Sequence, residues 1–483
     1  MRVDEKTIEQ IVAQVLAQID GQANREAPTP QPSPPPAAPR SQPTTDRELL
    51  RLHGVFPTVD EAVSAARTAQ GMLMELGVDK RKEIIAAWRK AALDNAERLA
   101  RLCVEETKIG RWEHKIEKNR VAAEKSPGVE FLEAPLALGD AGMSIDDYAP
   151  FGVICAVTPV TNPTSTVINN AIIMVAGGNA VVFAPHPTAK RCSLETMALL
   201  NDAAVSVGGP RNLLTAVAEP TIRTAQQMMK HRDVDLICAT GGKAVVREAL
   251  NSGKRAVCAG PGNPPAVVDE TADIPKAARD IVAGASFDNN LLCIGEKAVV
   301  VVESVADDLI RHMKREGAYE VVGMDAQRLA NAVFPRGEMN RNWVGKDAAV
   351  ILRDIGVHAP EDTKVALLEV ERGHTLLIEE QLMPILPVCR VRNFEEAMEV
   401  ALEIDGDRRH TFVIHSKDIT RIMRLRRAAN CTVFVANGPS YASEGVEGEG
   451  FLAMSLAGAT GEGFTSPRTF VRYRRFAMAG LKP

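Results

Sequence analysis

The sequence predicts an α/β protein whose core consists of two doubly wound parallel sheets. Short β-branched or apolar segments alternate with helix-length segments between residues 150 and 258, and a second series of the same kind runs from 266 to about 435. Strands that alternate with such helices form right-handed βαβ units, and these units build parallel sheets. The chain has 483 residues, 45% of them apolar and 25% charged, which suits two or three globular domains.

The order of the elements follows from apolar periodicity and from the glycines and prolines between the periodic segments. Helical periodicity comes first and predicts helices at 58–76, 80–105 and 112–123. Apolar and β-branched runs then predict strands at 152–158, 180–183, 213–217, 234–239 and 255–258. Between these strands, helical patterns predict helices at 164–175, 190–207, 221–231 and 243–250.

The turns after the first-series strands are candidate binding segments, because ligands of a doubly wound sheet bind beyond the carboxyl ends of its strands. These turns are residues 158–163, 184–187 and 240–243. No GxGxxG motif joins a strand to a helix, so the usual dinucleotide fingerprint is absent. Thr240-Gly241-Gly242 opens a helix and is able to receive a pyrophosphate on free N–H groups, although many such turns contain two glycines for steric reasons alone.

Cys293 lies in the connector between a helical pattern at 274–287 and a β-branched run at 298–302. A thiol in such a connector is accessible and lies near backbone N–H groups, which favour the reactive thiolate. The alternative is a small apolar residue in a buried turn, because a free cysteine is usually buried and inert. The local sequence leaves both interpretations open.

The N-terminus predicts a detached amphipathic helix over residues 1–20. Its apolar residues form one stripe, and residues 21–45 that follow are a proline-rich linker with eight of the chain's 29 prolines. A helix on such a spacer exposes its apolar face to a partner unless it docks on its own subunit, which is the alternative. A membrane-surface helix is disfavoured because the polar face is acidic.

Composition excludes several other classes of function. A net charge of −5 argues against general nucleic-acid affinity. The eight cysteines are dispersed without a CxxC pair, which indicates reduced intracellular thiols, and the nine histidines form no metal-binding pair. No apolar run approaches the ~18 residues of a transmembrane helix.

Six motifs follow one another along the chain. They are Thr158-Pro159-x-Thr161-Asn162-Pro163, Val181-Val182-Phe183-Ala184-Pro185-His186-Pro187, Thr240-Gly241-Gly242, Asp288-Asn289-Asn290-x-x-Cys293-Ile294-x-Glu296-Lys297, Asn437-Gly438-Pro439-Ser440-Tyr441-Ala442, and Thr460-Gly461-Glu462-Gly463-x-Thr465-Ser466-x-Arg468-Thr469-Phe470. Together they resemble the aldehyde dehydrogenase superfamily over about residues 46–483, and within it the CoA-acylating aldehyde dehydrogenases of bacterial microcompartments.

The resemblance implies roles for particular residues. Cys293 is the expected nucleophile, and Asn162 with the Cys293 backbone N–H is the expected oxyanion hole. Glu380 matches the carboxylate that contacts the nicotinamide ribose. NAD and coenzyme A are the expected cofactor and co-substrate, sharing an adenine pocket, and no metal is expected. The expected cofactor-binding residues are Thr158, Pro159, His186, Pro187, Thr240, Gly241, Gly242, Val245, Gly260, Glu380 and Leu382.

The resemblance also implies the domain organisation and the setting. The aldehyde dehydrogenase-like fold has a small β oligomerisation arm in addition to the two α/β domains, and a homodimer or homotetramer is expected. Residues 1–20 resemble encapsulation peptides, which implies binding to shell or cargo proteins within a cytoplasmic microcompartment. The expected segments are 46–132 with 150–257 for cofactor binding, 258–440 for catalysis, and 133–149 with 441–483 for oligomerisation.

One departure from the family pattern bears on the product. Hydrolytic members carry a water-activating Glu 34 positions before the nucleophile, and that position is Ala259 in this chain. Alanine cannot act as a general base, so a thioacyl enzyme would wait for a thiol such as CoA. The expected substrate is propionaldehyde or acetaldehyde. The alternatives are a hydrolytic aldehyde dehydrogenase and, in another class, a catalytically inactive scaffold protein.

Overall fold

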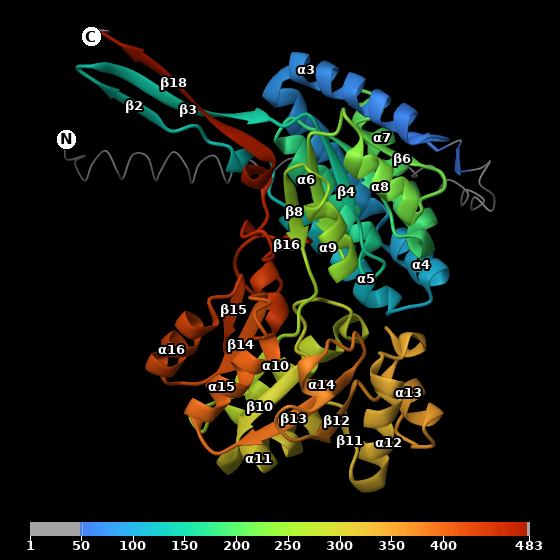
Figure 1. Ribbon diagram of the computed structural model, residues 1–483, viewed down its shortest axis with the longest axis vertical. Coiled ribbons are helices and arrows are strands. Elements are labelled where there is room, and N and C mark those ends of the chain that lie inside the picture. Colours follow the sequence, from blue (N-terminus) through green and yellow to red (C-terminus); the bar gives the residue numbers. More distant parts are fainter. Residues whose placement is uncertain (1–48, 51, 481–483) are drawn as a thin grey trace, which may run out of the picture. The chain divides into compact units, whose positions relative to one another are not determined.

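The computed structural model of the chain describes residues 49–50 and 52–480 (Figure 1). The amphipathic helix and the linker predicted for residues 1–20 and 21–45 lie outside the described residues. Within the described ranges, no helix has both the length and the apolar character needed to cross a membrane.

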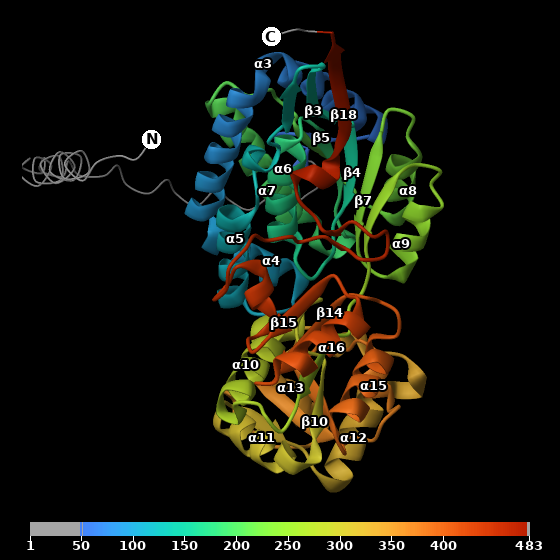
Figure 2. The same cartoon turned by 90° about the vertical axis from the view of Figure 1, so that its left-hand side faces the viewer.

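The first sheet is parallel, with the strand order β1-β6-β5-β4-β7-β8. Its strands are almost entirely apolar because helices cover both faces of the sheet. Figure 2 shows α6 and α7 on one side of β4 and β7, and α8 and α9 on the other. The bounds are β1 Val55–Phe56, β4 Val153–Val157, β5 Ala180–Ala184, β6 Leu214–Val217, β7 Leu236–Thr240, β8 Ala256–Ala259, α6 Pro163–Ala176, η2 Pro187–Ala189, α7 Lys190–Ser206, α8 Ile222–Lys230 and α9 Lys243–Leu250.

The helices before this sheet are divided differently from the prediction. The sequence predicts a break between residues 76 and 80, and α3 Val59–Asp94 does consist of two helices that meet at a kink at Gly77, where φ is 78° and ψ is −173°. Glycine accepts this positive φ without steric cost, so the chain turns there and a second helix follows. A further break, which the pattern does not predict, falls at Asn95, and the next elements are α4 Ala96–Thr107, α5 Trp112–Lys125 and η1 Val129–Phe131.

The second predicted series forms another parallel sheet, with the strand order β11-β12-β13-β10-β9-β14-β15. The prediction of two doubly wound sheets is therefore confirmed in the described part of the chain. The bounds are β9 Pro265–Val268, α10 Ile274–Ser286, η3 Phe287–Asn290, β10 Ala298–Val302, α11 Glu303–Arg315, β11 Ala318–Glu320, α12 Gly323–Val333, η4 Pro335–Gly337, η5 Arg341–Trp343, α13 Ala348–Asp354, β12 Val365–Glu369, α14 Thr375–Ile378, β13 Ile385–Val391, α15 Phe394–Asp405, β14 Thr411–His415, α16 Ile419–Ala429 and β15 Val433–Ala436.

An antiparallel arm of β2 Leu136–Gly139, β3 Gly142–Pro150 and β18 Val471–Ala479 projects from the first sheet (Figure 1). The sequence assigns residues 133–149 and 441–483 to oligomerisation, and that role stays a prediction; of the later range, β18 joins the arm. The preceding residues pack on the body, because β16 Leu456–Ala457 pairs with β17 Gly463–Phe464 and contacts β8. The elements that flank this pair are η6 Ser440–Glu444 and η7 Pro467–Phe470. Residues 441–470 are thus available to line a cavity.

Candidate active site

A cavity of about 760 Å³ lies at the carboxyl ends of β4, β5, β7 and β8, and residues near Cys293 and Glu380 close its other side. Every residue that the sequence predicts for catalysis or cofactor binding lines this cavity. They are Thr158, Pro159, Asn162, His186, Pro187, Thr240, Gly241, Gly242, Val245, Gly260, Cys293, Glu380 and Leu382. The structure therefore brings the whole predicted set together, although the roles of these residues stay predictions.

The start of α9 gives the cavity a place for an anionic group. Gly242 is the N-cap of this helix and provides no side-chain hydrogen bond to the first turn. A Cβ atom built on Gly242 would meet nothing within 4 Å, so the backbone is open to an approaching ligand. Uncapped first-turn N–H groups at a helix N-terminus bind phosphate well.

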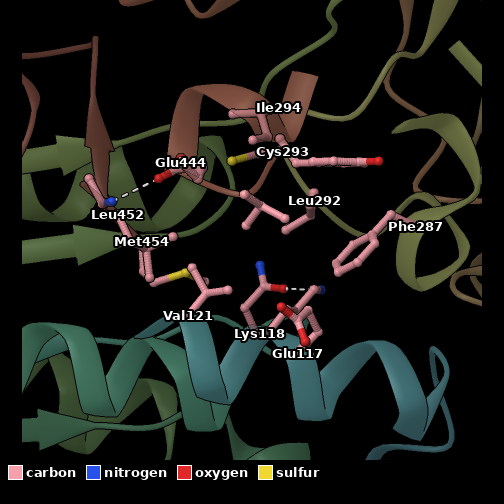
Figure 3. Close-up of a pocket in the computed structure, with 14 residues that line it drawn as sticks. Glu117, Lys118, Val121, Phe287, Leu292, Cys293, Ile294, Glu444, Leu452 and Met454 are labelled. Carbon is pink, nitrogen blue, oxygen red and sulfur yellow. Dashed lines mark hydrogen bonds between the residues drawn. The ribbon is translucent and has the colours of Figure 1, made fainter. Parts of the chain in front are cut away.

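Cys293 also lines a second, smaller cavity of about 50 Å³ (Figure 3). The residue is half-buried. Desolvation of the thiol, and to a lesser extent the nearby carboxyl groups of Glu380 and Glu444, raise its pKa to about 12. The prediction that the connector favours the thiolate is therefore wrong for this structure. Desolvation outweighs the backbone N–H groups, so the thiol is protonated at neutral pH and must lose its proton when it reacts.

Lys118 fixes the orientation of the Asn162 side chain. Its Nζ donates to Asn162 Oδ1 at 2.6 Å, while Asn162 Nδ2 donates to Thr161 Oγ1 at 3.1 Å. Because the ammonium group accepts no hydrogen bonds, it must face the amide oxygen and leaves the amide N–H group for another acceptor. Nothing in the local sequence around Lys118 indicates this role, since the two residues come from α5 and from the loop before α6.

The same lysine ties Asn162 to the loop that carries Cys293. Lys118 Nζ donates to Asp288 Oδ2 at 2.5 Å, and Lys115 Nζ donates to the same oxygen at 2.9 Å. Asp288 is fully buried, and its carboxylate remains charged because the two ammonium groups more than offset the effect of burial and lower its pKa. This buried charge cluster holds together the two chain segments that provide the predicted nucleophile and oxyanion donor.

The loop before Cys293 has an unusual backbone. Asp288, Asn289 and Asn290 have φ values of 48°, 55° and 61°, which few residues other than glycine, Asn and Asp tolerate. Side-chain hydrogen bonds hold the loop, because Asn289 Nδ2 donates to the Gly345 carbonyl at 2.9 Å and Asn290 Nδ2 to the Glu296 carbonyl at 2.9 Å. The Asp-Asn-Asn sequence is thus required by the turn that presents the thiol.

Lys297 supports this turn from within the protein. Its Nζ donates to the Asn290 carbonyl at 2.5 Å, to Asn290 Oδ1 at 2.7 Å and to the Leu292 carbonyl at 3.0 Å. Burial lowers the pKa of Lys297 to about 8, but all three ammonium protons are committed to the loop.

His410 is a buried group near Cys293 that sequence reasoning missed. A Cβ atom on Gly262 would lie 2.4 Å from the Cys293 carbonyl oxygen and 2.8 Å from His410 Nδ1, so only a glycine separates the two. Burial lowers the pKa of His410 to about 4, and its Nε2 has no hydrogen-bond partner among the described residues. The imidazole is therefore neutral. His410 belongs to no sequence motif, so the sequence alone does not indicate that it lies near Cys293.

Known proteins match both the sequence and this geometry. Residues 37–331 match the model of the Aldehyde dehydrogenase family. The chain belongs to the aldehyde dehydrogenase family. Acetaldehyde dehydrogenase (acetylating) EutE of Salmonella typhimurium is 45% identical over 432 residues, which cover 88% of this chain and 92% of that protein. Propanal dehydrogenase (CoA-propanoylating) of the same organism is 43% identical, with 88% and 92% covered.

Solved structures of family members have the same fold. A propionaldehyde dehydrogenase from the fucose utilisation bacterial microcompartment of Clostridium phytofermentans superposes with a TM-score of 0.87 at 45% identity, over 88% of this chain and 98% of that one. The Rhodopseudomonas palustris propionaldehyde dehydrogenase, solved with bound CoA and an acylated cysteine, has a TM-score of 0.87 at 44% identity with the same coverage. The predicted aldehyde dehydrogenase-like fold is thereby confirmed.

Proposed function

We propose that this chain is a CoA-acylating aldehyde dehydrogenase, which converts a short-chain aldehyde, CoA and NAD⁺ to acyl-CoA and NADH. The observation that carries the proposal is Ala259. It ends β8 and lines the same cavity as Cys293, where hydrolytic members of the family have a Glu that activates water. Relatives at 43–45% identity bear names of acetylating and CoA-propanoylating enzymes, which support propionaldehyde or acetaldehyde as the substrate.

The residues of the larger cavity fit a dinucleotide. The N-terminus of α9 suits a pyrophosphate, and Thr158, His186 and Pro187 line the part of the cavity formed by the loops after β4 and β5. Partial desolvation lowers the pKa of His186. Its imidazole ring lines the cavity and is able to lie against an adenine ring. Bound NAD⁺ supplies the two-electron oxidant for the aldehyde.

The residues of the chain account for the remaining chemistry. Cys293 Sγ adds to the aldehyde carbonyl and forms a thiohemiacetal, and the product of its oxidation is a thioester on this sulfur. Burial raises the pKa of Glu380 to about 7, so a carboxylate is available in the same cavity to accept the thiol proton near neutral pH. Asn162 Nδ2 and the Cys293 N–H group stabilise the developing oxyanion. The CoA thiol then takes the acyl group and regenerates Cys293.

Ala259→Glu tests why the product is a thioester. If the missing base is what protects the acyl enzyme from water, the new carboxylate raises acid formation without CoA and lowers the acyl-CoA rate. Chromatography of acid and acyl-CoA products measures both. Ala259→Gln is the matched control, since it has the same size but is not a base. Background acid formation by a folded Ala259→Glu variant would contradict the proposal that Ala259 decides the product.

We also propose that residues 1–20 carry the enzyme into a bacterial microcompartment in the cytoplasm by laying their apolar stripe on a shell or cargo protein. The stripe of Ile8, Ile11, Val12, Val15, Leu16 and Ile19 supports this proposal. Each large apolar side chain contributes roughly 1.5–3 kcal/mol when buried, before ordering costs, which is enough for reversible docking.

Deletion of residues 1–45 is expected to leave the turnover of the purified enzyme nearly unchanged and to release it from microcompartments in cells. Turnover and the fraction that co-purifies with intact shells are the measurements. Ile11→Asp with Val15→Asp is the matched full-length variant and should behave like the deletion. Loss of activity, or full retention on shells, would show that the helix belongs to the body of the enzyme.

A further inference from the structure

The smaller cavity beside Cys293 contains a carboxyl group that the proposed reaction does not use. Glu444 is the last residue of η6, and it is only 6% exposed. Most of the residues that surround it in the cavity are apolar (Figure 3). They include Val121, Phe287, Leu292, Ile294, Val446, Leu452, Ala453 and Met454. A carboxyl group in such surroundings is costly unless a partner satisfies it.

The protein satisfies only part of this carboxyl group. Ala453 N donates to Glu444 Oε2 at 2.8 Å, and this is its only side-chain hydrogen bond among the described residues. Burial raises the pKa of Glu444 to about 8, so the group is a neutral acid at pH 7. A neutral carboxylic acid has an O–H donor and further acceptor capacity, and both are left for whatever occupies the cavity.

Glu444 lies close enough to Cys293 to contact an acyl group that the sulfur carries. Both residues line the same cavity of about 50 Å³, and the charge of an ionised Glu444 raises the pKa of Cys293. A cavity needs about 10–15 Å³ of volume open to a water-sized sphere to hold one water molecule. The space therefore holds only a few heavy atoms beyond the carbonyl carbon. A short acyl chain therefore brings its own substituent near this carboxyl.

We propose that Glu444 binds a hydroxyl group on the acyl chain of the substrate, so that the enzyme prefers short hydroxyaldehydes over unsubstituted alkanals of the same length. The inference rests on the proposed acylating function and specifies its substrate class. A hydroxyl both donates and accepts, which matches the unpaired donor and acceptor of Glu444. Lys118 and Glu117 both line the same cavity, so the charges of the other lining residues do not by themselves favour an ammonium group.

The preference follows from an asymmetry in molecular recognition. An apolar pocket rejects an added hydroxyl only weakly, whereas a site with a buried polar group strongly rejects an analogue that leaves that group unpaired. Propanal leaves the O–H group of Glu444 without an acceptor, because Ala453 N only donates to this side chain, whereas 2-hydroxypropanal or 3-hydroxypropanal provides an acceptor. An apolar residue of similar size in place of Glu444 should favour the binding of propanal, because no polar group is left unpaired, and should remove the hydrogen bond to the hydroxyl of a hydroxyaldehyde.

The test compares kcat/KM for propanal, 2-hydroxypropanal and 3-hydroxypropanal in the wild type, Glu444→Leu and Glu444→Gln, with CoA and NAD⁺ at pH 7. Acyl-CoA and free acid are quantified by chromatography. The wild type is expected to prefer at least one hydroxyaldehyde by about tenfold or more, and Glu444→Leu should reverse that preference. Glu444→Gln is the matched control, because its amide still donates and accepts and should keep the preference.

The outcomes separate this inference from the proposed function. Preference of the wild type for propanal, or an unchanged substrate ratio in Glu444→Leu, overturns the assignment of Glu444 while acyl-CoA formation stands. If Glu444→Leu does not fold, the wild-type preference and its retention in Glu444→Gln decide the question. Loss of free acid in Glu444→Gln, with acyl-CoA unchanged, would identify Glu444 as a base for water and also overturn the inference. Absence of acyl-CoA from every aldehyde would instead overturn the proposed function.

Discussion

Cys293→Ser is expected to lower CoA-dependent NADH formation by at least about a thousandfold while the protein stays folded. A serine hydroxyl is a much weaker acid than a thiol, and burial already holds the pKa of the Cys293 thiol at about 12. The same environment would make an alkoxide inaccessible near neutral pH. Initial NADH formation with saturating aldehyde and CoA is the measurement, together with the thermal unfolding midpoint.

Cys431→Ser is the matched control for this substitution. Cys431 is also a partly exposed free thiol, but it lines neither of the two cavities beside Cys293. We expect this variant to keep wild-type turnover. If Cys293→Ser retained more than about a tenth of the wild-type rate, the nucleophile would have to be another residue.

Asn162→Ala is expected to lower kcat by about 10²–10³-fold, the usual effect of removing one oxyanion donor. Alanine also removes Oδ1, which accepts from Lys118 Nζ at 2.6 Å, so a slower rate alone does not identify the donor. Asn162→Asp separates the two effects, because its carboxylate still accepts from Lys118 but cannot donate to an oxyanion. Both variants should be slow. A wild-type rate in Asn162→Asp would contradict the oxyanion role of Asn162.

The strand–helix alternation of this fold could be predicted from the sequence because each element has its own periodicity and its own breakers. The connector that contains Cys293 lies between α10 and β10, as the pattern predicted. The break predicted near Gly77 is present as a kink between two helices, whereas the break at Asn95 inside the predicted helix 80–105 was missed. The packing of β16 against β8 joins segments far apart in the sequence, which no local pattern indicates.

The residues of the candidate site that belong to sequence motifs could be predicted, whereas those that reach the site through tertiary contacts could not. Lys118 and Asp288 are 170 positions apart, so no local pattern indicates that they meet. Glu444 lies in a glycine-rich segment without periodicity, so the sequence does not indicate that its side chain is buried in the folded protein. The protonated state of Cys293 was missed for the same reason, since desolvation depends on what the whole fold places around the thiol.

Helix α5 has a consequence for redesign of this enzyme. Lys118 holds the catalytic loops from this helix, and Val121, one turn later on the same helix, lines the small cavity. Val121, which shapes the acyl pocket, and Lys118, which orients Asn162 and binds Asp288, therefore lie on the same helix. A library aimed at bulkier acyl groups should vary position 121 through side-chain volume alone and avoid any glycine or proline that would move position 118.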